Sequence, residues 1–256
     1  MLRPSNIDGS FGALEEVERI IAQIREHWPE VEILLRGDSG FARDELMHWC
    51  EENNVDYLFG LSKNKRLTAQ ISAELETAKT KFEETGESAR VFKDFRYSTL
   101  DSWSSERRVV AKAEYLAKGS NPRFVVTSLE KELIPAQELY EDYYCIRGDM
   151  ENRIKECQLS LFAARTSTET MRANQLRLWF SAVAYVIMNA FRKYVLKDTD
   201  LEKAQPDTLR NKVLKIGARV TISARRIYIS FSSAYPYKEL FSQAFNFLAS
   251  SRLAVT

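Results

Sequence analysis

The chain has 256 residues, is 45% hydrophobic and 29% charged, and contains only 9 Gly and 6 Pro, which excludes disordered and fibrous classes. No apolar run reaches the roughly 20 residues that cross a bilayer, and the first residues lack the apolar core of a secretion signal. We therefore expect a cytoplasmic, nucleoid-associated protein without a membrane partner. The formal net charge is only +1, yet residues 171–256 hold 14 Lys and Arg against 5 Asp and Glu. This basic segment favours a polyanionic partner such as nucleic acid, and a solvated basic helical surface is the alternative.

The first third of the chain alternates between helical and strand patterns. Apolar residues recur at helical spacing over 13–28, 42–53 and 64–84. Short apolar runs at 31–35 and 55–61 predict buried strands. The resulting order α-β-α-β-α predicts a sheet with helices packed on it.

The middle of the chain predicts strands, and the rest is mainly helical. Aromatic and β-branched runs at 91–97, 107–115 and 123–129 indicate three successive antiparallel strands. We expect helices at 135–144, 150–165, 169–197, 207–215 and 237–249, and a strand pair across 217–231. In the long helix we expect most apolar positions to be buried, namely Leu176, Trp179, Phe180, Val183, Ile187 and Phe191.

Two carboxylates are candidates for a metal site. Asp38 follows the first predicted strand in a glycine-bounded turn, and Glu151 lies in the first turn of a predicted helix. A carboxylate at a strand end and one on a helix packed across it can share divalent magnesium, because hard cations prefer oxygen ligands. Two such ions promote phosphodiester displacement. Residue type alone favours a turn or cap role for Asp38 and a surface pairing with Lys155 for Glu151.

The spacing around Glu151 carries a family resemblance. Tyr144, Arg147 and Glu151 are separated by two and three residues, which resembles the tyrosine-arginine-glutamate signature of bacterial insertion-sequence transposases of the DDE type. Residues 34–41 resemble the segment that bears the second catalytic aspartate of that family. Further segments agree, and together they resemble the insertion-sequence thirteen-eighty branch over almost the whole chain; they are 55–61, 103–112 and 174–180.

The resemblance implies an α/β fold. It would be a ribonuclease-H-like core, with its first strands missing, an inserted antiparallel β-rich segment and a helical C-terminal region. The implied parts are a partial core with the second Asp at 1–88, the β-rich insertion at 89–130, a core helix region with the Glu at 131–168, and a basic, mainly helical region at 169–256.

The resemblance also implies residue roles. Asp38 and Glu151 would be catalytic and bind Mg²⁺ in a two-metal site, with Mn²⁺ as the alternative ion. Tyr144 and Arg147 would position DNA phosphate. The full signature has a lysine seven residues after the glutamate, but Gln158 stands there, so Arg153 or Lys155 would supply a phosphate contact. The first catalytic aspartate of the family precedes the matching segments, and we expect this chain to begin after it.

Two further groups of residues are predicted to contact DNA. Trp103 is followed by Arg107 and Arg108 and is a candidate for stacking on an extruded base, as in related transposases. A tryptophan packed in a strand face is the alternative. Arg225 and Arg226 lie in the basic segment, where we expect contacts to phosphate.

The sequence therefore favours a DNA transposase that cleaves transposon terminal repeats and joins them to target DNA, as a homodimer in its synaptic complex. The rival interpretation is a catalytically inactive fragment that binds DNA or oligomerises and so competes with full-length transposase. A third is an unrelated helical nucleic-acid binder with structural carboxylates.

Overall fold

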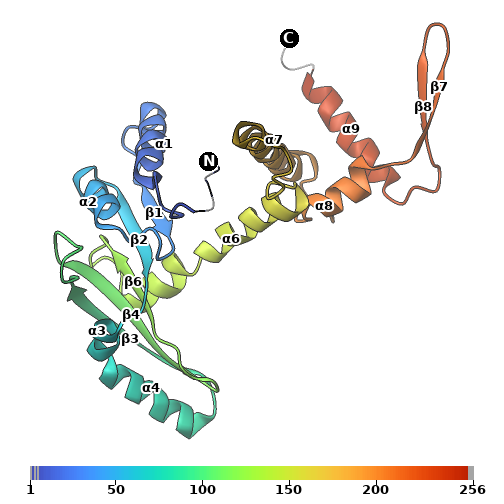
Figure 1. Ribbon diagram of the computed structural model, residues 1–256. Helices are drawn as coiled ribbons and strands as arrows, with labels where there is room; N and C mark the ends of the chain where they lie inside the picture. The colour runs from blue at the N-terminus through green and yellow to red at the C-terminus, as the bar shows by residue number, and fades with distance from the viewer. Residues whose placement is uncertain (1, 3, 5, 253–256) are drawn as a thin grey trace. The chain divides into compact units, whose positions relative to one another are not determined.

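The computed structural model describes residues 2, 4 and 6–252. They divide into two compact units, one of residues 3–149 and one that begins at Met150. The first unit is built on a mixed sheet with helices, and the second is mainly helical with one hairpin (Figure 1). The chain is thus a mixed α/β protein, as predicted. No helix in the described part of the chain is long and apolar enough to cross a membrane.

One mixed sheet organises the first unit. Its strands are β1 (Leu34–Gly37), β2 (Asp56–Leu61), β3 (Ala89–Tyr97), β4 (Arg107–Leu116), β5 (Gly119–Ser120) and β6 (Arg123–Thr127). The strand order is β1-β2-β6-β4-β3, and the short β5 pairs with β4. β1 and β2 are parallel, whereas the other neighbours are antiparallel. The β-rich segment predicted at 89–130 therefore continues this sheet through β6.

Alternation along the strands explains why helices cover both faces of the sheet. In β2, Tyr57 and Phe59 face one buried cluster, while Leu58 faces another. The first cluster packs against α1 (Ala13–His27), α2 (Asp44–Glu52) and α3 (Lys65–Gln70). The second packs against residues 134–144, which include α5 (Ala136–Glu138) and a π-helical stretch, Leu139–Tyr144. A buried strand with apolar residues on both faces is what the run at 55–61 predicts.

The predicted elements of the first unit are confirmed with shifted bounds. The first strand begins at Leu34 instead of Val31. The helix predicted at 64–84 is broken at Ile71 into α3 and α4 (Ser72–Thr85). The buried Ile71 side chain joins the core at this break. Packing of the two short helices on the sheet therefore overrides the continuous helical pattern.

The second unit contains four helices in its described part and one hairpin. The helices are α6 (Arg147–Lys155), whose first residues belong to the first unit, α7 (Met171–Ala190), α8 (Pro206–Leu209) and α9 (Lys238–Arg252). π-helical turns continue three of them, at Glu156–Ser160, Phe191–Val195 and Arg210–Leu214. The hairpin consists of β7 (Ala218–Ile222) and β8 (Ile227–Phe231). The second unit has a small cluster of buried apolar residues: Met188, Leu196, Leu201, Leu209 and Val213.

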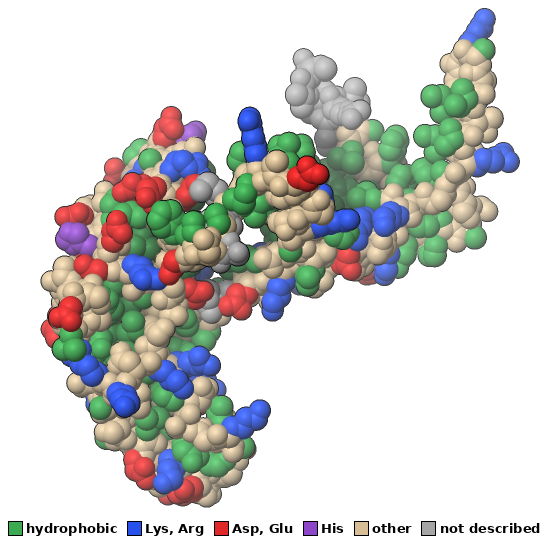
Figure 2. Space-filling view, viewed as in Figure 1, with side chains coloured by type: hydrophobic (Ala, Val, Ile, Leu, Met, Phe, Trp, Pro, Cys, Tyr) green, Lys and Arg blue, Asp and Glu red, His purple; other side chains and the backbone are tan. Residues whose placement is uncertain are grey.

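The prediction that α7 buries its apolar residues is wrong for most of them. Trp179, Phe180 and Ile187 are 60%, 66% and 61% exposed, and Leu176 and Val183 are exposed as well. Of the six predicted positions, only Phe191, just after α7, packs against the buried cluster of this unit. The buried positions of α7 are Ser181 and Met188. Figure 2 shows hydrophobic side chains at the surface of this part of the chain.

Candidate active site

Asp38 lies just past the carboxyl end of β1, as predicted. Its Oδ1 accepts a hydrogen bond of 2.9 Å from the backbone N–H of Gly40. The Phe41 N–H in turn donates to the Asp38 carbonyl at 3.1 Å. Asp38 is therefore the first residue of a tight Asx turn, which is the structural role that its residue type favours. The side chain is exposed, and its Oδ2 accepts no hydrogen bond from the described residues.

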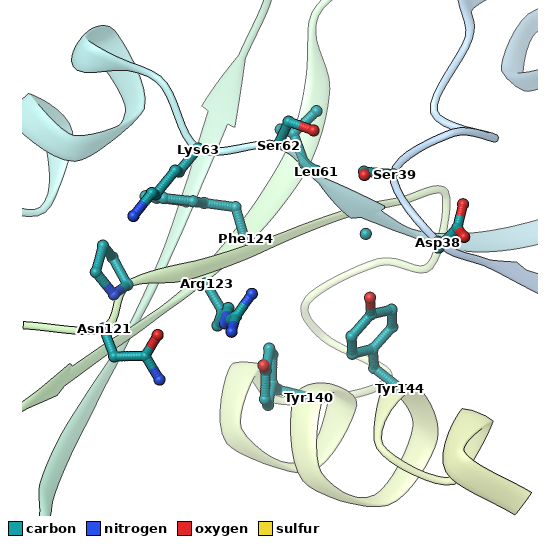
Figure 3. Close-up of a pocket in the computed structure, with 12 residues that line it drawn as sticks. Asp38, Ser39, Leu61, Ser62, Lys63, Asn121, Arg123, Phe124, Tyr140 and Tyr144 are labelled. Atoms are coloured by element: carbon teal, nitrogen blue, oxygen red, sulfur yellow. The ribbon is translucent and has the colours of Figure 1, made fainter. Parts of the chain in front are cut away.

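Asp38 borders a cavity of about 440 Å³ within the first unit. The carboxyl ends of the parallel strands β1 and β2 meet at this edge of the sheet, which brings Asp38 and Ser39 beside residues 60–63. The start of β6 lies against the end of β2, because Leu61 pairs with Phe124. Tyr140 and Tyr144 close the cavity from the π-helical stretch (Figure 3).

Tyr144 is the part of the resemblance signature that the structure brings to Asp38. Its hydroxyl points toward the loop of Asp38 and Ser39 (Figure 3). A Cβ added at Gly60 would lie 2.5 Å from that hydroxyl oxygen and 3.2 Å from the Ser39 backbone nitrogen. Only a residue without a side chain leaves room for Tyr144 there. The sequence segment at 55–61 and the tyrosine thus meet in one site.

Replacing Gly60 with Ala is therefore expected to displace Tyr144 and to destabilise the fold by about 1–3 kcal/mol, the usual cost of overpacking. Urea denaturation measures this loss. Adding Tyr144→Phe, which removes the hydroxyl oxygen, should restore most of the stability. Gly217→Ala is the control, because a Cβ there meets nothing within 4 Å. A double variant as unstable as Gly60→Ala alone would contradict the proposed clash.

Lys63 and Arg123 line the same cavity, and neither was predicted from the sequence. Both side chains are exposed, and neither has a hydrogen bond or ion pair with the described residues. Lys63 follows β2 and Arg123 begins β6, so they come together only through the antiparallel pairing of those strands. The sequence could have indicated Lys63, because it follows the end of the second predicted strand as Asp38 follows the end of the first. No local sequence pattern indicates that Arg123 lies at this site.

Tyr140 is a buried residue of the cavity wall. Burial raises the pKa of Tyr140 to about 12, so its hydroxyl stays protonated and can donate a hydrogen bond at neutral pH. The ring packs 5.5 Å from that of Tyr144, measured between ring centroids. Two unpaired cations, a carboxylate and tyrosine hydroxyls thus surround a space that is suited to a phosphate-bearing ligand.

The remaining signature residues lie on α6. Glu151, in the second unit, is exposed, and so are Arg153 two residues later and Lys155 one turn later. Arg153 lies 3.8 Å from Glu156, from guanidinium nitrogen to carboxylate oxygen. α6 begins at Arg147, whose side chain lies outside the described part of the structure. The helix predicted from Met150 therefore starts three residues earlier, and Glu151 remains near its N-terminus.

Arg107 and Arg108 are buried, which does not support the predicted contact with DNA. The Arg107 side chain is 3% exposed and binds two carboxylates, Asp44 at 2.6 Å and Glu51 at 2.6 Å. Arg108 binds Asp94 at 2.6 Å and also donates to two backbone carbonyl oxygens. Both guanidinium groups are already neutralised inside the fold, so neither is available to phosphate.

Trp103 packs in the first unit instead of standing free. Its ring meets Tyr97 edge-on, with centroids 5.8 Å apart, and it lies against the core cluster. The Arg107 guanidinium carbon lies 5.6 Å from the centroid of the indole. These contacts favour the packed alternative over stacking on an extruded base.

Arg225 and Arg226 are two exposed arginines of the second unit. Both are exposed in the turn that joins β7 to β8. No ion pair links either of them to a described residue. Their charges are therefore free to meet phosphate.

The metal site has only one of its predicted ligands at the cavity of the first unit. No group of three or more His, Cys, Asp and Glu side chains is arranged to hold a metal ion among residues 2, 4 and 6–252. Asp38 nevertheless offers an oxygen without a hydrogen-bond donor at the edge of a polar cavity, and such an oxygen fits a hard divalent cation.

A known protein family matches almost the whole chain. The sequence matches the family described as transposase DDE domain, group 1, over residues 1–253. No curated protein matches the chain. The family match implies DNA as a partner, and it favours neither the inactive competitor nor an unrelated helical binder. A match over almost the whole sequence shows that the chain belongs to the transposase DDE domain group 1 family.

Proposed function

We propose that the protein is the transposase of an insertion sequence of the thirteen-eighty branch, which binds transposon ends and target DNA and cleaves and joins strands with divalent metal. One observation carries the proposal: in a chain of this family, Asp38 and Tyr144 border one cavity that also holds two unpaired cations. The four residues come from four separate segments of the chain, and the family resemblance implies roles for two of them, Asp38 and Tyr144.

The catalytic core is proposed to be ribonuclease-H-like. The parallel pair β1 and β2 and the helices α1 and α2 support it, since Asp38 follows the first of these strands. We keep residues 1–88 and 131–168 as the two segments of this core. Residues 89–130 are its β-rich insertion and residues 169–256 are its basic C-terminal region.

Asp38 and Glu151 would hold the metal, Mg²⁺ or Mn²⁺. Bound metal in such a site activates the attacking oxygen and stabilises the leaving oxygen of a phosphodiester. Exposed carboxylates mounted at a strand end and on a helix suit that task. Two assigned carboxylates do not complete a two-metal site, so strand cleavage would need a further oxygen ligand beside Asp38 and Glu151.

The chain's own cations orient the DNA strand. Lys63 and Arg123 attract a phosphate into the cavity, and the hydroxyls of Tyr140 and Tyr144 donate hydrogen bonds to its oxygens. Arg147, Arg153 and Lys155 are proposed to extend this contact along α6. Arg225 and Arg226 and the rest of the basic C-terminal region hold the DNA backbone elsewhere, and two copies of the chain join in the synaptic complex.

A salt titration tests the cavity as a phosphate site. Replacing Lys63 and Arg123 with Ala should weaken binding to duplex DNA and lower the log–log salt slope by about 0.9 for each lost contact. Fluorescence anisotropy over a range of KCl concentrations measures both quantities.

The matched control is Lys81→Ala with Lys118→Ala. It removes the same charge from exposed positions of the first unit that do not line the cavity. We expect the slope of this control to stay that of the unmodified protein. Equal slopes for both double variants would show that the cavity does not bind phosphate, and no binding by the unmodified protein would refute the function as a whole.

A further inference from the structure

The hairpin of β7 and β8 has two chemically different faces. Its register pairs Val220 with Ile229 and Ile222 with Ile227. Side chains alternate across the strands, so one face is entirely apolar and the other polar. The apolar face is formed by Ala218, Val220, Ile222, Ile227, Ile229 and Phe231, and the polar face by Arg219, Thr221, Tyr228 and Ser230. Every residue of both strands is exposed.

The hairpin is also strongly basic. Residues 218–231 include Arg219, Arg225 and Arg226 and contain no Asp or Glu. Two of these three arginines lie side by side in the turn. This charge fits a polyanion and opposes docking on a basic protein surface.

Hydrogen bonds order the turn of the hairpin, and a contact with α9 anchors its base. In the turn, the Ser223 N–H donates to the Arg226 carbonyl at 2.9 Å, and the Arg226 N–H donates to the Ser223 hydroxyl at 3.2 Å. At the base, Phe231 meets Phe241 of α9, with ring centroids 5.2 Å apart. The apolar pair next to the turn has no such cover: Ile222 is 75% exposed and Ile227 is 67% exposed.

We propose that this hairpin is an arm that enters the minor groove of duplex DNA, an inference that rests on the proposed DNA-binding function. An isolated two-stranded hairpin is marginally stable in water, so these apolar residues need a partner. Arginines are drawn into narrow, A·T-rich minor grooves by their negative potential. Ile222 and Ile227 stand directly behind the arginines, where minor-groove proteins carry apolar wedges that part base steps.

The major groove fits this arm less well. Its floor presents hydrogen-bond donors and acceptors from every base pair. Isoleucines lying on that floor would leave those groups without partners, whereas apolar wedges in the minor groove insert between base steps instead of covering the floor. The minor groove is narrower, about 6 Å wide in B-DNA, so two strands about 4.8 Å apart require it to open. We therefore expect the arm to bend DNA as it enters.

Groove-specific competition tests the arm. An A·T-rich duplex is titrated with the full chain in the presence of netropsin, which fills the minor groove, or methyl green, which fills the major groove. Netropsin should weaken binding roughly tenfold or more, the scale of one lost set of groove contacts. Methyl green should not. The Arg225→Ala/Arg226→Ala variant should bind more weakly and lose its response to netropsin.

The control and the wedge variant separate the alternatives. Lys81→Ala/Lys118→Ala removes the same charge from the first unit and should keep the netropsin response. Ile222→Thr/Ile227→Thr keeps residues that favour strands. It should preserve the salt slope while reducing DNA bending in a circular-permutation mobility assay. Circular dichroism checks that both hairpin variants are folded.

Three results would overturn the inference. Competition by methyl green alone would place the protein in the major groove. Hairpin variants that bind and bend DNA like the unmodified protein would leave DNA binding intact and remove the arm from it. A threonine variant that changes from dimer to monomer with unchanged DNA affinity would show that the apolar face packs on a second copy of the chain.

Discussion

Replacing Asp38 with Asn is expected to abolish iron-directed cleavage of the polypeptide at both proposed metal ligands. Fe²⁺ takes the place of Mg²⁺ on oxygen ligands, and with ascorbate and peroxide it generates hydroxyl radicals that cut the nearby backbone. If Asp38 and Glu151 share metal, the unmodified chain should be cut near both residues. Removing either carboxylate charge, by Asp38→Asn or Glu151→Gln, should then remove both cuts. Peptide mapping by mass spectrometry reads the cut positions.

This test addresses metal binding apart from catalysis, because it needs no DNA cleavage. Asp101→Asn is the matched control, since Asp101 is an exposed aspartate of the first unit that does not line the cavity. It should leave both cuts in place. Cuts at position 38 that persist in Glu151→Gln would mean that the two carboxylates hold metal separately, and the shared site would be lost.

Replacing Arg107 with Ala is expected to cause the largest loss of stability, about 2–4 kcal/mol, because it breaks a buried ion pair. The Arg107 side chain is 3% exposed, whereas Asp44 and Glu51 are 27% and 32% exposed. Water can therefore reach the carboxylates that are left behind, which keeps the loss below the upper end for fully buried pairs. Urea denaturation measures the change, and Arg96→Ala, on the neighbouring strand but exposed, should cost less than about 1 kcal/mol.

The same cluster predicts a dependence on pH. Partial burial alone would raise the pKa of Asp44 and of Glu51. Hydrogen bonds from Ser104 and Arg107 outweigh burial at Asp44, and hydrogen bonds from Arg107 and Tyr57 outweigh it at Glu51, so both pKa values are lowered. A depressed pKa in the folded state stabilises the protein above the unfolded-state pKa, and this contribution is lost as pH falls through the folded-state value. The Arg107→Ala variant should therefore lose less stability on acidification below about pH 4. A variant with unchanged acid sensitivity would contradict this account.

Local patterns predicted most of the first unit because its elements carry clear periodicities. The run at 55–61 is apolar on both faces, and it forms a central strand. Asp38 could be placed at a strand end for the same reason. Tyr144 came from the resemblance alone, since nothing in the neighbouring sequence indicates that it reaches Gly60 across the cavity.

Long-range partners account for what the sequence did not predict. Arg107 is paired with carboxylates 56 and 63 positions away, and no spacing rule joins such residues. A pair of arginines beside a tryptophan is equally typical of a DNA surface and of a buried cluster. The pattern along α7 indicates that the helix has apolar residues, but burial depends on which elements pack against it.

The position of β1 at the sheet edge also bears on how the first unit opens. β3 and β4 form a hairpin with nine paired positions, whereas β1 has four residues and one neighbour, reached through the crossover of α2. Local unfolding begins where few backbone hydrogen bonds and little buried area hold a segment. The amide protons of β1 should exchange with solvent sooner than those of β4, so Asp38 follows a strand that opens more readily than the centre of the sheet.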